Sequence, residues 1–181
     1  RSCVSLTFED GGQLFFNDLR RFGYLRLVDG KTLDQIITNN YGPEPLDKSF
    51  SQGSFAVSLK KSRRSIKAVL LDQKVIAGLG NIYVDESLFA AGIRPTRTAN
   101  SLKPVEVSQL FKAIPRILRK SLKYRGTTFR NYLDGSGQKG NFSEKLQVYG
   151  RGGQKCYRCG EIIKKIRVAG RGTHYCPHCQ K

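Results

Sequence analysis

Hydrophobic and polar residues alternate at the start of the chain, with the period of two that is typical of a half-buried β-strand. The alternation covers residues 4–8 and resumes at 14–16, and the Glu-Asp-Gly-Gly sequence at 9–12 is typical of a turn. The pattern therefore predicts a β-hairpin. Because an isolated two-stranded hairpin is only marginally stable in water, we expect residues 1–28 to be the last strands of a larger β-domain whose amino-terminal portion is absent from this sequence.

The middle of the chain has the longer period of amphipathic helices. Residues 29–58 are predicted to be a connector with a helix of one or two turns, because Thr32-Leu33-Asp34-Gln35 has the spacing of a capping box. Gly42-Pro43-Glu44-Pro45 then favours extended backbone. We place a mainly helical domain at residues 59–145. Two stripes with helical spacing mark it: Ile66, Val69, Leu70 and Gln73, and then Leu110, Ile114, Ile117 and Leu118, continued by Ser121 and Leu122. Pro115 should kink or divide the second helix.

A glycine turn lies between the two stripes. The first helix is predicted to end at Asp72 or Gln73, the turn contains Gly78 and Gly80, and Asn81 is predicted to cap the next helix. This is a helix-turn-helix layout. A helix amino terminus offers unpaired N–H groups, and Gly80 permits close approach, so a phosphate fits there. The alternative is that these residues only form the turn and cap the helix. The surrounding basic residues favour the phosphate: Lys60, Lys61, Arg63, Arg64 and Lys67.

Four cysteines near the carboxyl end have the spacing C-x2-C-x16-C-x2-C. They are Cys156, Cys159, Cys176 and Cys179. Two such pairs complete a tetrahedral thiolate site, so the sequence predicts one Zn²⁺; the alternative is two disulfides in a small secreted module. Four sulfurs leave no open position, which makes the zinc structural, and neither His174 nor His178 is needed as a ligand. The β-forming residues between the pairs and the turn sequence at 169–172 predict a hairpin, within a zinc finger at 146–181.

Composition narrows the class of partner. The chain has 32 Lys and Arg against 14 Asp and Glu, a formal net charge of +18. Such a charge favours a polyanion, although a basic ribosomal protein or a merely solvated surface would have it too. No apolar run approaches the length of a membrane span and no secretory signal is present. With only Cys3 outside the cysteine pairs, the cysteine usage suits a reducing cytosol.

Four stretches, in this order along the chain, carry a resemblance to a known family. They are Leu19-Arg20-Arg21-Phe22-Gly23; Gly42-Pro43-Glu44-Pro45-Leu46; residues 71–83, from Leu-Asp-Gln to Gly-Asn-Ile-Tyr; and Val148-Tyr149-Gly150-Arg151 with the later Gly170-Arg171-Gly172-Thr173. The chain resembles formamidopyrimidine-DNA glycosylase, the bacterial base-excision-repair family that removes oxidised purines such as 8-oxoguanine. The resemblance implies an α+β fold: an amino-terminal β-sandwich, a helix–two-turns–helix domain and a β-hairpin zinc finger.

The resemblance also implies DNA contacts at Arg20, Phe22, Gly80, Asn81, Tyr149 and Arg171. Phe22 matches a wedge that enters the duplex when the damaged base flips out, and Arg20 matches the donor to the widowed cytosine. Asn81 matches a phosphate contact of the helical motif, Arg171 one on the zinc hairpin, and Tyr149 resembles another. Simpler roles stay open from the residues alone. Phe22 could be a core residue, Arg171 an exposed turn residue and Tyr149 a packed side chain.

The resemblance further implies an activity for the parent protein. Residues 127–143 resemble the loop that covers flipped 8-oxoguanine, which favours the formamidopyrimidine branch over the endonuclease VIII branch. The family's nucleophile is an amino-terminal proline that forms a Schiff base with C1′, assisted by a neighbouring glutamate. This chain starts Arg1-Ser2-Cys3. We therefore expect a parent DNA glycosylase/AP lyase, and a 181-residue chain without catalytic residues that binds DNA and excises no bases.

The expected partner is double-stranded DNA that contains an oxidised purine or an abasic site. We expect a monomer in the bacterial cytoplasm, associated with the nucleoid and not with a membrane. The alternative function is a non-enzymatic zinc-ribbon and helix-turn-helix module that binds DNA. Such a module would explain the charge, the cysteines and the glycine turn, but not the Leu-Arg-Arg-Phe-Gly stretch upstream of them.

Overall fold

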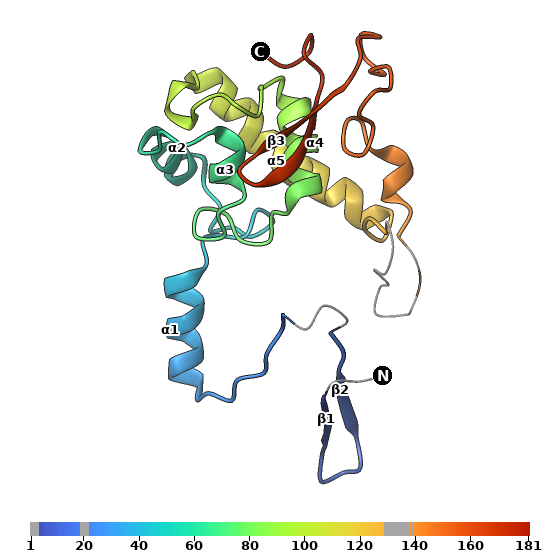
Figure 1. Cartoon of the computed structure of the whole chain (residues 1–181). Coiled ribbons are helices and arrows are strands. Elements are labelled where there is room, and N and C mark those ends of the chain that lie inside the picture. The colour runs from blue at the N-terminus through green and yellow to red at the C-terminus, as the bar shows by residue number, and fades with distance from the viewer. Residues whose placement is uncertain (1–3, 19–21, 129–137, 139) are drawn as a thin grey trace. The chain divides into compact units, whose positions relative to one another are not determined.

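The computed structural model describes residues 4–18, 22–128, 138 and 140–181 (Figure 1). The chain divides into two compact units, Arg1–Ile36 and Ile37–Lys181. Helices make up most of the second unit, and each unit contains one two-stranded antiparallel sheet. The predicted α+β class is therefore confirmed. Among the described residues, none of the helices combines the length and the apolar character needed to cross a membrane.

The first unit begins with the predicted hairpin. Strand β1 (Val4–Thr7) pairs antiparallel with β2 (Gln13–Phe16), in a register that sets Val4 opposite Phe16 and Thr7 opposite Gln13. Gly11 has a φ of +84°, which only glycine adopts without strain, and it allows the tight return of the chain. The apolar side chains of the hairpin are largely exposed, among them Leu14 and Phe15. Within the described residues nothing covers them.

Helix α1 (Gly30–Asn40) follows, and it is longer than predicted. It begins before Thr32, so the predicted helix start at the Thr-x-x-Gln sequence is wrong. Asp29 acts at this end instead, because its Oδ1 accepts the Thr32 N–H at 2.7 Å. Aspartate is a preferred residue at such a position, since its carboxylate satisfies an N–H that has no partner within the helix.

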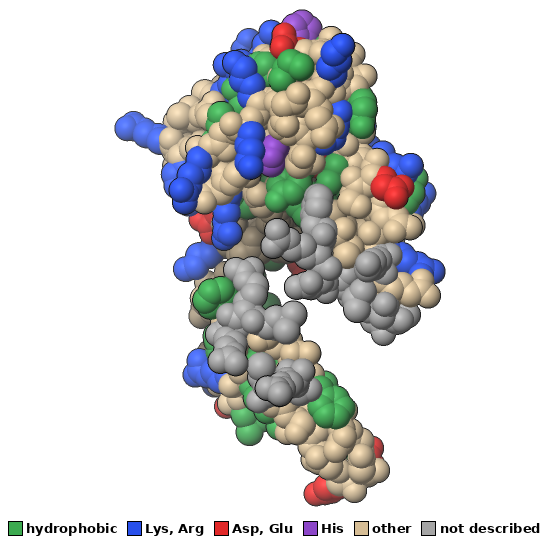
Figure 2. Space-filling view, turned by 45° about the vertical axis from the view of Figure 1, so that its right-hand side comes forward, with side chains coloured by type: hydrophobic (Ala, Val, Ile, Leu, Met, Phe, Trp, Pro, Cys, Tyr) green, Lys and Arg blue, Asp and Glu red, His purple; other side chains and the backbone are tan. Residues whose placement is uncertain are grey.

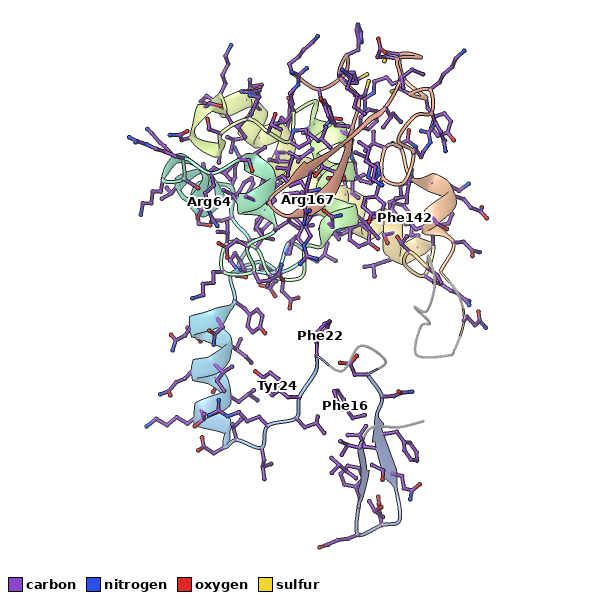
Figure 3. The ribbon with its side chains drawn as sticks, viewed as in Figure 1. Phe16, Phe22, Tyr24, Arg64, Phe142 and Arg167 are labelled. Atoms are coloured by element: carbon purple, nitrogen blue, oxygen red, sulfur yellow. The ribbon has the colours of Figure 1, made fainter. Side chains whose placement is uncertain are left out.

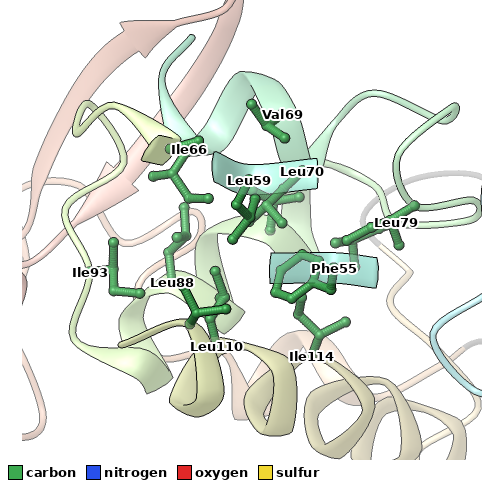
Figure 4. Close-up of a cluster of buried hydrophobic side chains, with 14 of the residues drawn as sticks. Phe55, Leu59, Ile66, Val69, Leu70, Leu79, Leu88, Ile93, Leu110 and Ile114 are labelled. Atoms are coloured by element: carbon green, nitrogen blue, oxygen red, sulfur yellow. The ribbon is translucent and has the colours of Figure 1, made fainter. Parts of the chain in front are cut away.

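The core of the second unit is helical and apolar. Its helices are α2 (Gln52–Lys60), α3 (Ile66–Leu70), α4 (Asn81–Ala91), the 3₁₀ turn η1 (Ala99–Ser101) and α5 (Pro104–Lys123). Figure 4 shows their side chains meeting in one cluster, in which Ile66, Leu88 and Leu110 are fully buried. Helix α4 is apolar on most sides because it packs against α5 and also against the zinc hairpin. It therefore lies at the centre of the unit.

Two details of α5 differ from what the sequence predicts. The helix runs unbroken from Pro104 to Lys123, so Pro115 does not divide it. Proline cannot donate one backbone hydrogen bond of the helix. Packing of the apolar face of α5 on α2 and α4 compensates for the loss of that bond. Leu122 does not continue the buried stripe either, because its side chain is 64% exposed. Ser121, in contrast, is buried as expected.

The carboxyl end forms the predicted zinc hairpin. After the 3₁₀ turn η2 (Phe142–Lys145), strand β3 (Lys164–Val168) pairs antiparallel with β4 (Arg171–Tyr175). The turn is shorter than expected, since only Ala169 and Gly170 lie between the strands. Both have positive φ, +50° and +71°, as a two-residue hairpin turn requires. Arg171 is therefore the first residue of β4.

Candidate nucleic-acid interface and zinc centre

The four predicted zinc ligands come together. The sulfurs of Cys156, Cys159, Cys176 and Cys179 all lie within 4.8 Å of one another. The Cys156–Cys179 sulfurs are 4.0 Å apart and the Cys159–Cys176 sulfurs 3.5 Å apart. Tetrahedral zinc with Zn–S bonds of about 2.3 Å would set them about 3.8 Å apart, so the residues fit the ion. All four are free cysteines, so the disulfide alternative is wrong. This is a structural site for one Zn²⁺, and both histidines lie outside the sulfur cluster.

Gln180 ties the second cysteine pair to the helical core. Its Oε1 accepts the Cys176 N–H at 2.8 Å, and its Nε2 donates to the Ile93 carbonyl at 2.8 Å. The side chain is fully buried, so both bonds are shielded from water. Sequence reasoning missed this residue. A glutamine directly after the last cysteine gives no signal of its own, because its partner lies 87 residues earlier.

The glycine turn of the helical motif is organised by one side chain. Gln73 accepts the Gly78 N–H through Oε1 at 2.8 Å and donates to the Leu79 carbonyl through Nε2 at 3.2 Å. Gly78 has a φ of +75°, a backbone conformation that glycine adopts without strain and other residues rarely adopt. Gly80 is the N-cap of α4, with no side-chain cap, so the prediction that Asn81 caps the helix is wrong. A Cβ at Gly80 would meet nothing within 4 Å, which leaves room for a ligand.

Asn81 instead connects the motif to the zinc hairpin. Its Nδ2 donates to the Gly172 carbonyl at 3.0 Å, and its Oδ1 is buried without a partner among the described residues. The side chain thus turns away from the capping position and toward β4. An amide nitrogen carries two hydrogens, so the contact with Gly172 uses only half of its donor capacity. Val84 makes the first intrahelical bond, to the Gly80 carbonyl, so the N–H groups before it have no partner within α4.

A buried ion pair also contacts the Gly172 carbonyl to which Asn81 donates. Lys67 Nζ lies 2.6 Å from Asp85 Oδ1 and also donates to the Gly172 carbonyl at 3.2 Å. Asp85 Oδ2 accepts the His174 N–H at 2.8 Å. Both charged side chains are fully buried. Burial raises the pKa of Asp85 to about 6, against the opposing effect of Lys67, and burial lowers the pKa of Lys67.

The sequence suggested that Lys67 belongs to the exposed basic residues around the turn. The structure shows instead that Lys67 is buried. Arg64 is also engaged, because its Nη2 lies 2.8 Å from Asp72 Oδ2. Lys60, Lys61 and Arg63 are exposed. Figure 2 shows how Lys and Arg side chains predominate over acidic ones on the face that it presents.

Glu86 holds the segment that enters the zinc finger. Its buried carboxylate accepts three consecutive backbone N–H groups, from Gln147, Val148 and Tyr149, at 2.9–3.0 Å. Burial raises the pKa of Glu86, and these bonds oppose the rise. The Tyr149 ring meets His174 edge-on, with centroids 5.1 Å apart. Sequence reasoning missed Asp85 and Glu86. Their signal was two adjacent acids inside an otherwise apolar helix.

These contacts position Arg171. The outward edge of β4 would leave backbone groups unpaired, and side chains from α3 and α4 satisfy them at Gly172 and His174. Arg171 is exposed at the start of that strand, next in sequence to the carbonyl that Asn81 binds. Its guanidinium lies near enough to Lys67 for its charge to lower the pKa of that amine. A helix amino terminus and a guanidinium thus share one surface, which is able to bind an anion.

The remaining predicted residues belong to other parts of the chain. Phe22 is 77% exposed, so it is not a core residue of the described unit; Figure 3 shows its ring projecting from the backbone. Its N–H and that of Gly23 donate to Asp18 Oδ2. Arg20 lies outside the described residues, and so do 129–137 and 139 of the predicted lesion-covering loop.

The base of that loop is described and tightly closed. The Asn141 N–H donates to the Tyr124 carbonyl at 2.9 Å, and the Phe142 N–H donates to the Gly126 carbonyl at 3.0 Å. A Cβ at Gly140 would lie 2.3 Å from the Gly126 carbonyl oxygen, so this close approach requires glycine. Tyr83 of α4 adds a hydroxyl contact to Ser121 at 2.7 Å and to Thr127 at 3.3 Å. The loop therefore starts and ends at fixed points on the helical core.

The glycine turn and the zinc hairpin each lie within a stretch that matches a known sequence family. The profile described as "Formamidopyrimidine-DNA glycosylase H2TH domain" matches residues 41–132, just over half of the chain. The chain belongs to the formamidopyrimidine-DNA glycosylase family. A second profile, "Zinc finger found in FPG and IleRS", matches residues 153–181. The resemblance carried by the four sequence stretches is thereby confirmed.

Curated relatives of the family cover nearly the whole chain. The formamidopyrimidine-DNA glycosylase of Carboxydothermus hydrogenoformans is 48% identical over 93% of this chain and 61% of the relative. That of Enterococcus faecalis is 48% identical over 98% of this chain and 64% of the relative. The chain thus spans just under two thirds of the length of these relatives.

Solved structures of the family are similar as well. The Lactococcus lactis Fpg in complex with abasic-site DNA aligns with a TM-score of 0.87 and 43% identity, covering 98% of this chain and 65% of that one. A complex of the same protein with Fapy-dG-containing DNA gives 0.86 and 42%, over 98% and 64%. The MutM (FPG) protein of Thermus thermophilus gives 0.85 and 40%, over 97% and 67%.

Proposed function

We propose that this chain is the part of a DNA glycosylase/AP lyase that recognises and binds damaged DNA, the parent enzyme removing oxidised purines. The observation that carries the proposal is the junction between Asn81 and Gly172. It places the amino terminus of α4 and Arg171 on one surface, where both can bind phosphates of one duplex. The similar Lactococcus lactis structures hold abasic-site and Fapy-dG DNA, which supports the choice of lesion.

In this proposal each site residue has a defined role. Asn81 and Arg171 donate to phosphates next to the lesion, and Gly80 lets the backbone approach. Tyr149, which packs on His174, adds a further phosphate contact. Phe22 enters the stack in place of the flipped base and Arg20 binds the widowed cytosine, which offsets part of the few kcal/mol that flipping costs.

We propose further that the 181-residue chain binds without excising bases. The resemblance assigns the Schiff base to an amino-terminal proline, and no position of this sequence matches it. Zinc supplies no Lewis-acid chemistry here, because four sulfurs complete its coordination and it stabilises the hairpin.

A binding comparison on duplexes of one sequence tests the first proposal. The duplexes carry an abasic-site analogue, 8-oxoguanine or no lesion, and titrations are made at fixed salt. We expect about tenfold tighter binding to the abasic analogue than to undamaged DNA, because the energy for unpairing a base is already saved. Equal affinity for all three, together with tighter binding to one base sequence in a second set of undamaged duplexes that differ in sequence, would support the non-enzymatic regulator.

Borohydride trapping on the 8-oxoguanine duplex tests the second proposal separately. We expect no covalent product above that of a protein-free control. Efficient trapping with strand cleavage would contradict binding without excision, while lesion preference in the titrations would still stand.

A further inference from the structure

A second basic surface lies on the solvent side of α5. Its cations recur every three or four residues, so they share one side of the helix. They are Lys112, Arg116, Arg119, Lys120 and Lys123, all exposed, and are termed the α5 stripe. The opposite side of the helix holds Leu110, Ile114 and Ser121, which are buried in the core. The stripe therefore points away from the rest of the unit.

The charge of the α5 stripe is not neutralised within the described part of the chain. Between Val107 and Lys123 the helix has no Asp or Glu. Its one acid, Glu106, is engaged by Arg97 and by the Lys103 N–H. No ion pair or hydrogen bond to another described residue engages the stripe side chains. Five like charges on about three turns repel one another, and an anionic partner would relieve that repulsion.

The α5 stripe continues onto the zinc finger. Arg158, from the first cysteine pair, stacks on the Phe89 ring with its guanidinium carbon 4.4 Å from the ring centroid. It lines a cleft of about 330 Å³ together with Lys112, Arg116 and the end of α4 at 90–92. This end lies about 15 Å from Asn81 at the other end of the helix, by the rise of about 1.5 Å per residue. The cleft is thus separate from the surface of Asn81 and Arg171.

The two surfaces adjoin different sides of α4, because Tyr83 contacts Ser121 of α5 whereas Asp85, two residues later, contacts His174 of β4. Strand β4, which carries Arg171, packs on α4, and α5 packs on it as well; the stripe faces outward from α5. In Figure 1 the hairpin of β3 and β4 crosses α4, and α5 lies on the same helix.

We propose that the α5 stripe, extended by Arg158, binds the phosphodiester backbone of a second segment of nucleic acid. From Lys112 to Lys123 the stripe is about 16 Å long. One strand of a duplex carries a charge about every 3.4 Å of its axis, so this length matches about five phosphates. The number of cations in the stripe is the same.

The composition of the surface favours a nucleic acid over an acidic protein. Protein interfaces depend on buried aromatic or aliphatic anchors, with charges at the rim. The cleft is lined by no aromatic or large aliphatic side chain; apart from its cations and Gln109, its lining residues are the small Ala90, Ala91, Gly92 and Ala113. Evenly spaced Lys and Arg without anchors instead suit a partner recognised by its charge alone.

A bridging experiment tests the proposal. The zinc-loaded chain is bound to an immobilised abasic-site duplex, and retention of a second, fluorescent undamaged duplex is measured at low salt. The stripe variant is K112Q/R116Q/R119Q/K123Q. The matched control, K31Q/K48Q/K103Q/K155Q, removes the same charge from exposed lysines elsewhere. We expect the wild type and the control to retain the second duplex. The stripe variant should retain at most roughly one fifth of the amount that the wild type retains.

The affinity for the immobilised duplex is measured separately. The proposal requires that the stripe variant loses more retention of the second duplex than affinity for the immobilised one. That measurement also reports lesion preference, whose failure would concern the proposed function and not the α5 stripe. Absence of bridging by the wild type, or equal losses in the stripe variant and the control, would overturn the proposal. Displacement of the second duplex by polyglutamate at lower charge concentration than by unlabelled DNA would also overturn it, in favour of an acidic protein.

Discussion

Asn81 Nδ2 donates a hydrogen bond to the Gly172 carbonyl at 3.0 Å, and this bond joins the glycine turn to the zinc hairpin across 91 residues of sequence. The same carbonyl accepts from Lys67 Nζ at 3.2 Å. Two donors on one carbonyl restrain the hairpin at the residue next to Arg171. The two elements that we propose to bind phosphates therefore have a fixed spacing in the free protein, which would reduce the ordering cost of binding.

Asn81→Ala should lower both stability and DNA affinity. Loss of one hydrogen bond at the junction is expected to reduce the free energy of unfolding by about 1 kcal/mol. Loss of a phosphate donor should weaken binding to damaged and undamaged duplexes by the same factor. Urea unfolding and duplex titrations measure the two effects. Asn100→Ala, at an exposed residue, is the control and should change neither. Unaltered DNA affinity in Asn81→Ala would argue for a purely structural asparagine.

The pair of Lys67 and Asp85 should show strong coupling. Asp85→Leu leaves a buried ammonium without its counterion, which is expected to cost about 3–5 kcal/mol. Because burial raises the pKa of Asp85 to about 6 even beside Lys67, the attraction does not fully offset desolvation. The double variant Lys67→Met/Asp85→Leu should therefore be less destabilised than the sum of its single variants. Urea unfolding of all four proteins, with zinc bound, gives the coupling energy. Additive losses would show that the two side chains act independently.

The zinc site and both hairpins could be predicted from sequence because their signals are local. A C-x2-C pair aims two sulfurs at one point, and alternating residues around a glycine turn pair with each other. The buried acids of α4 could not be predicted in the same way. Asp85 binds His174, and Glu86 binds residues 147–149, so their partners lie 61–89 residues away. Local patterns give no information about such distances.

The errors have the same physical origin. Asparagine is a preferred N-cap residue, yet the side chain of Asn81 donates its hydrogen bond to the Gly172 carbonyl of the zinc hairpin. Pro115 is a helix breaker by propensity, yet packing of the apolar face of α5 on α2 and α4 outweighs the lost backbone bond. Lys67 belonged to a basic stretch, and only the fold shows that it is buried. In each case tertiary contacts overrode a local preference.

Arg171→Ala should weaken binding to all duplexes equally and make it less sensitive to salt. One phosphate contact contributes about 0.9 to the slope of log affinity against log salt, so the slope should fall by about one. Arg171→Lys keeps the charge but not the paired donors, and it should restore the slope with only part of the affinity. Titrations from low to moderate salt measure both quantities. An unchanged slope in Arg171→Ala would place the residue outside the interface.

Removal of zinc should abolish the contribution of Arg171 without touching that residue. The hairpin has too small a core to persist alone, so a chelator or Cys176→Ser should unfold it. The salt slope of the zinc-free protein is then expected to equal that of Arg171→Ala, and chelation of Arg171→Ala should not reduce it further. Circular dichroism should show that the helices remain. A further loss of slope on chelating Arg171→Ala would indicate that other zinc-finger residues bind phosphates as well.

Phe22→Ala should reduce the preference for damaged DNA more than the affinity for DNA in general. The ring is 77% exposed, so its removal leaves no cavity and should hardly change stability. A wedge acts only where a base has left the stack, so truncation is expected to weaken binding to an abasic-site duplex and to leave undamaged duplex nearly unaffected. Tyr24→Ala removes a neighbouring aromatic ring of similar exposure and serves as the control. Equal losses of affinity on both duplexes would contradict the wedge and indicate a general contact.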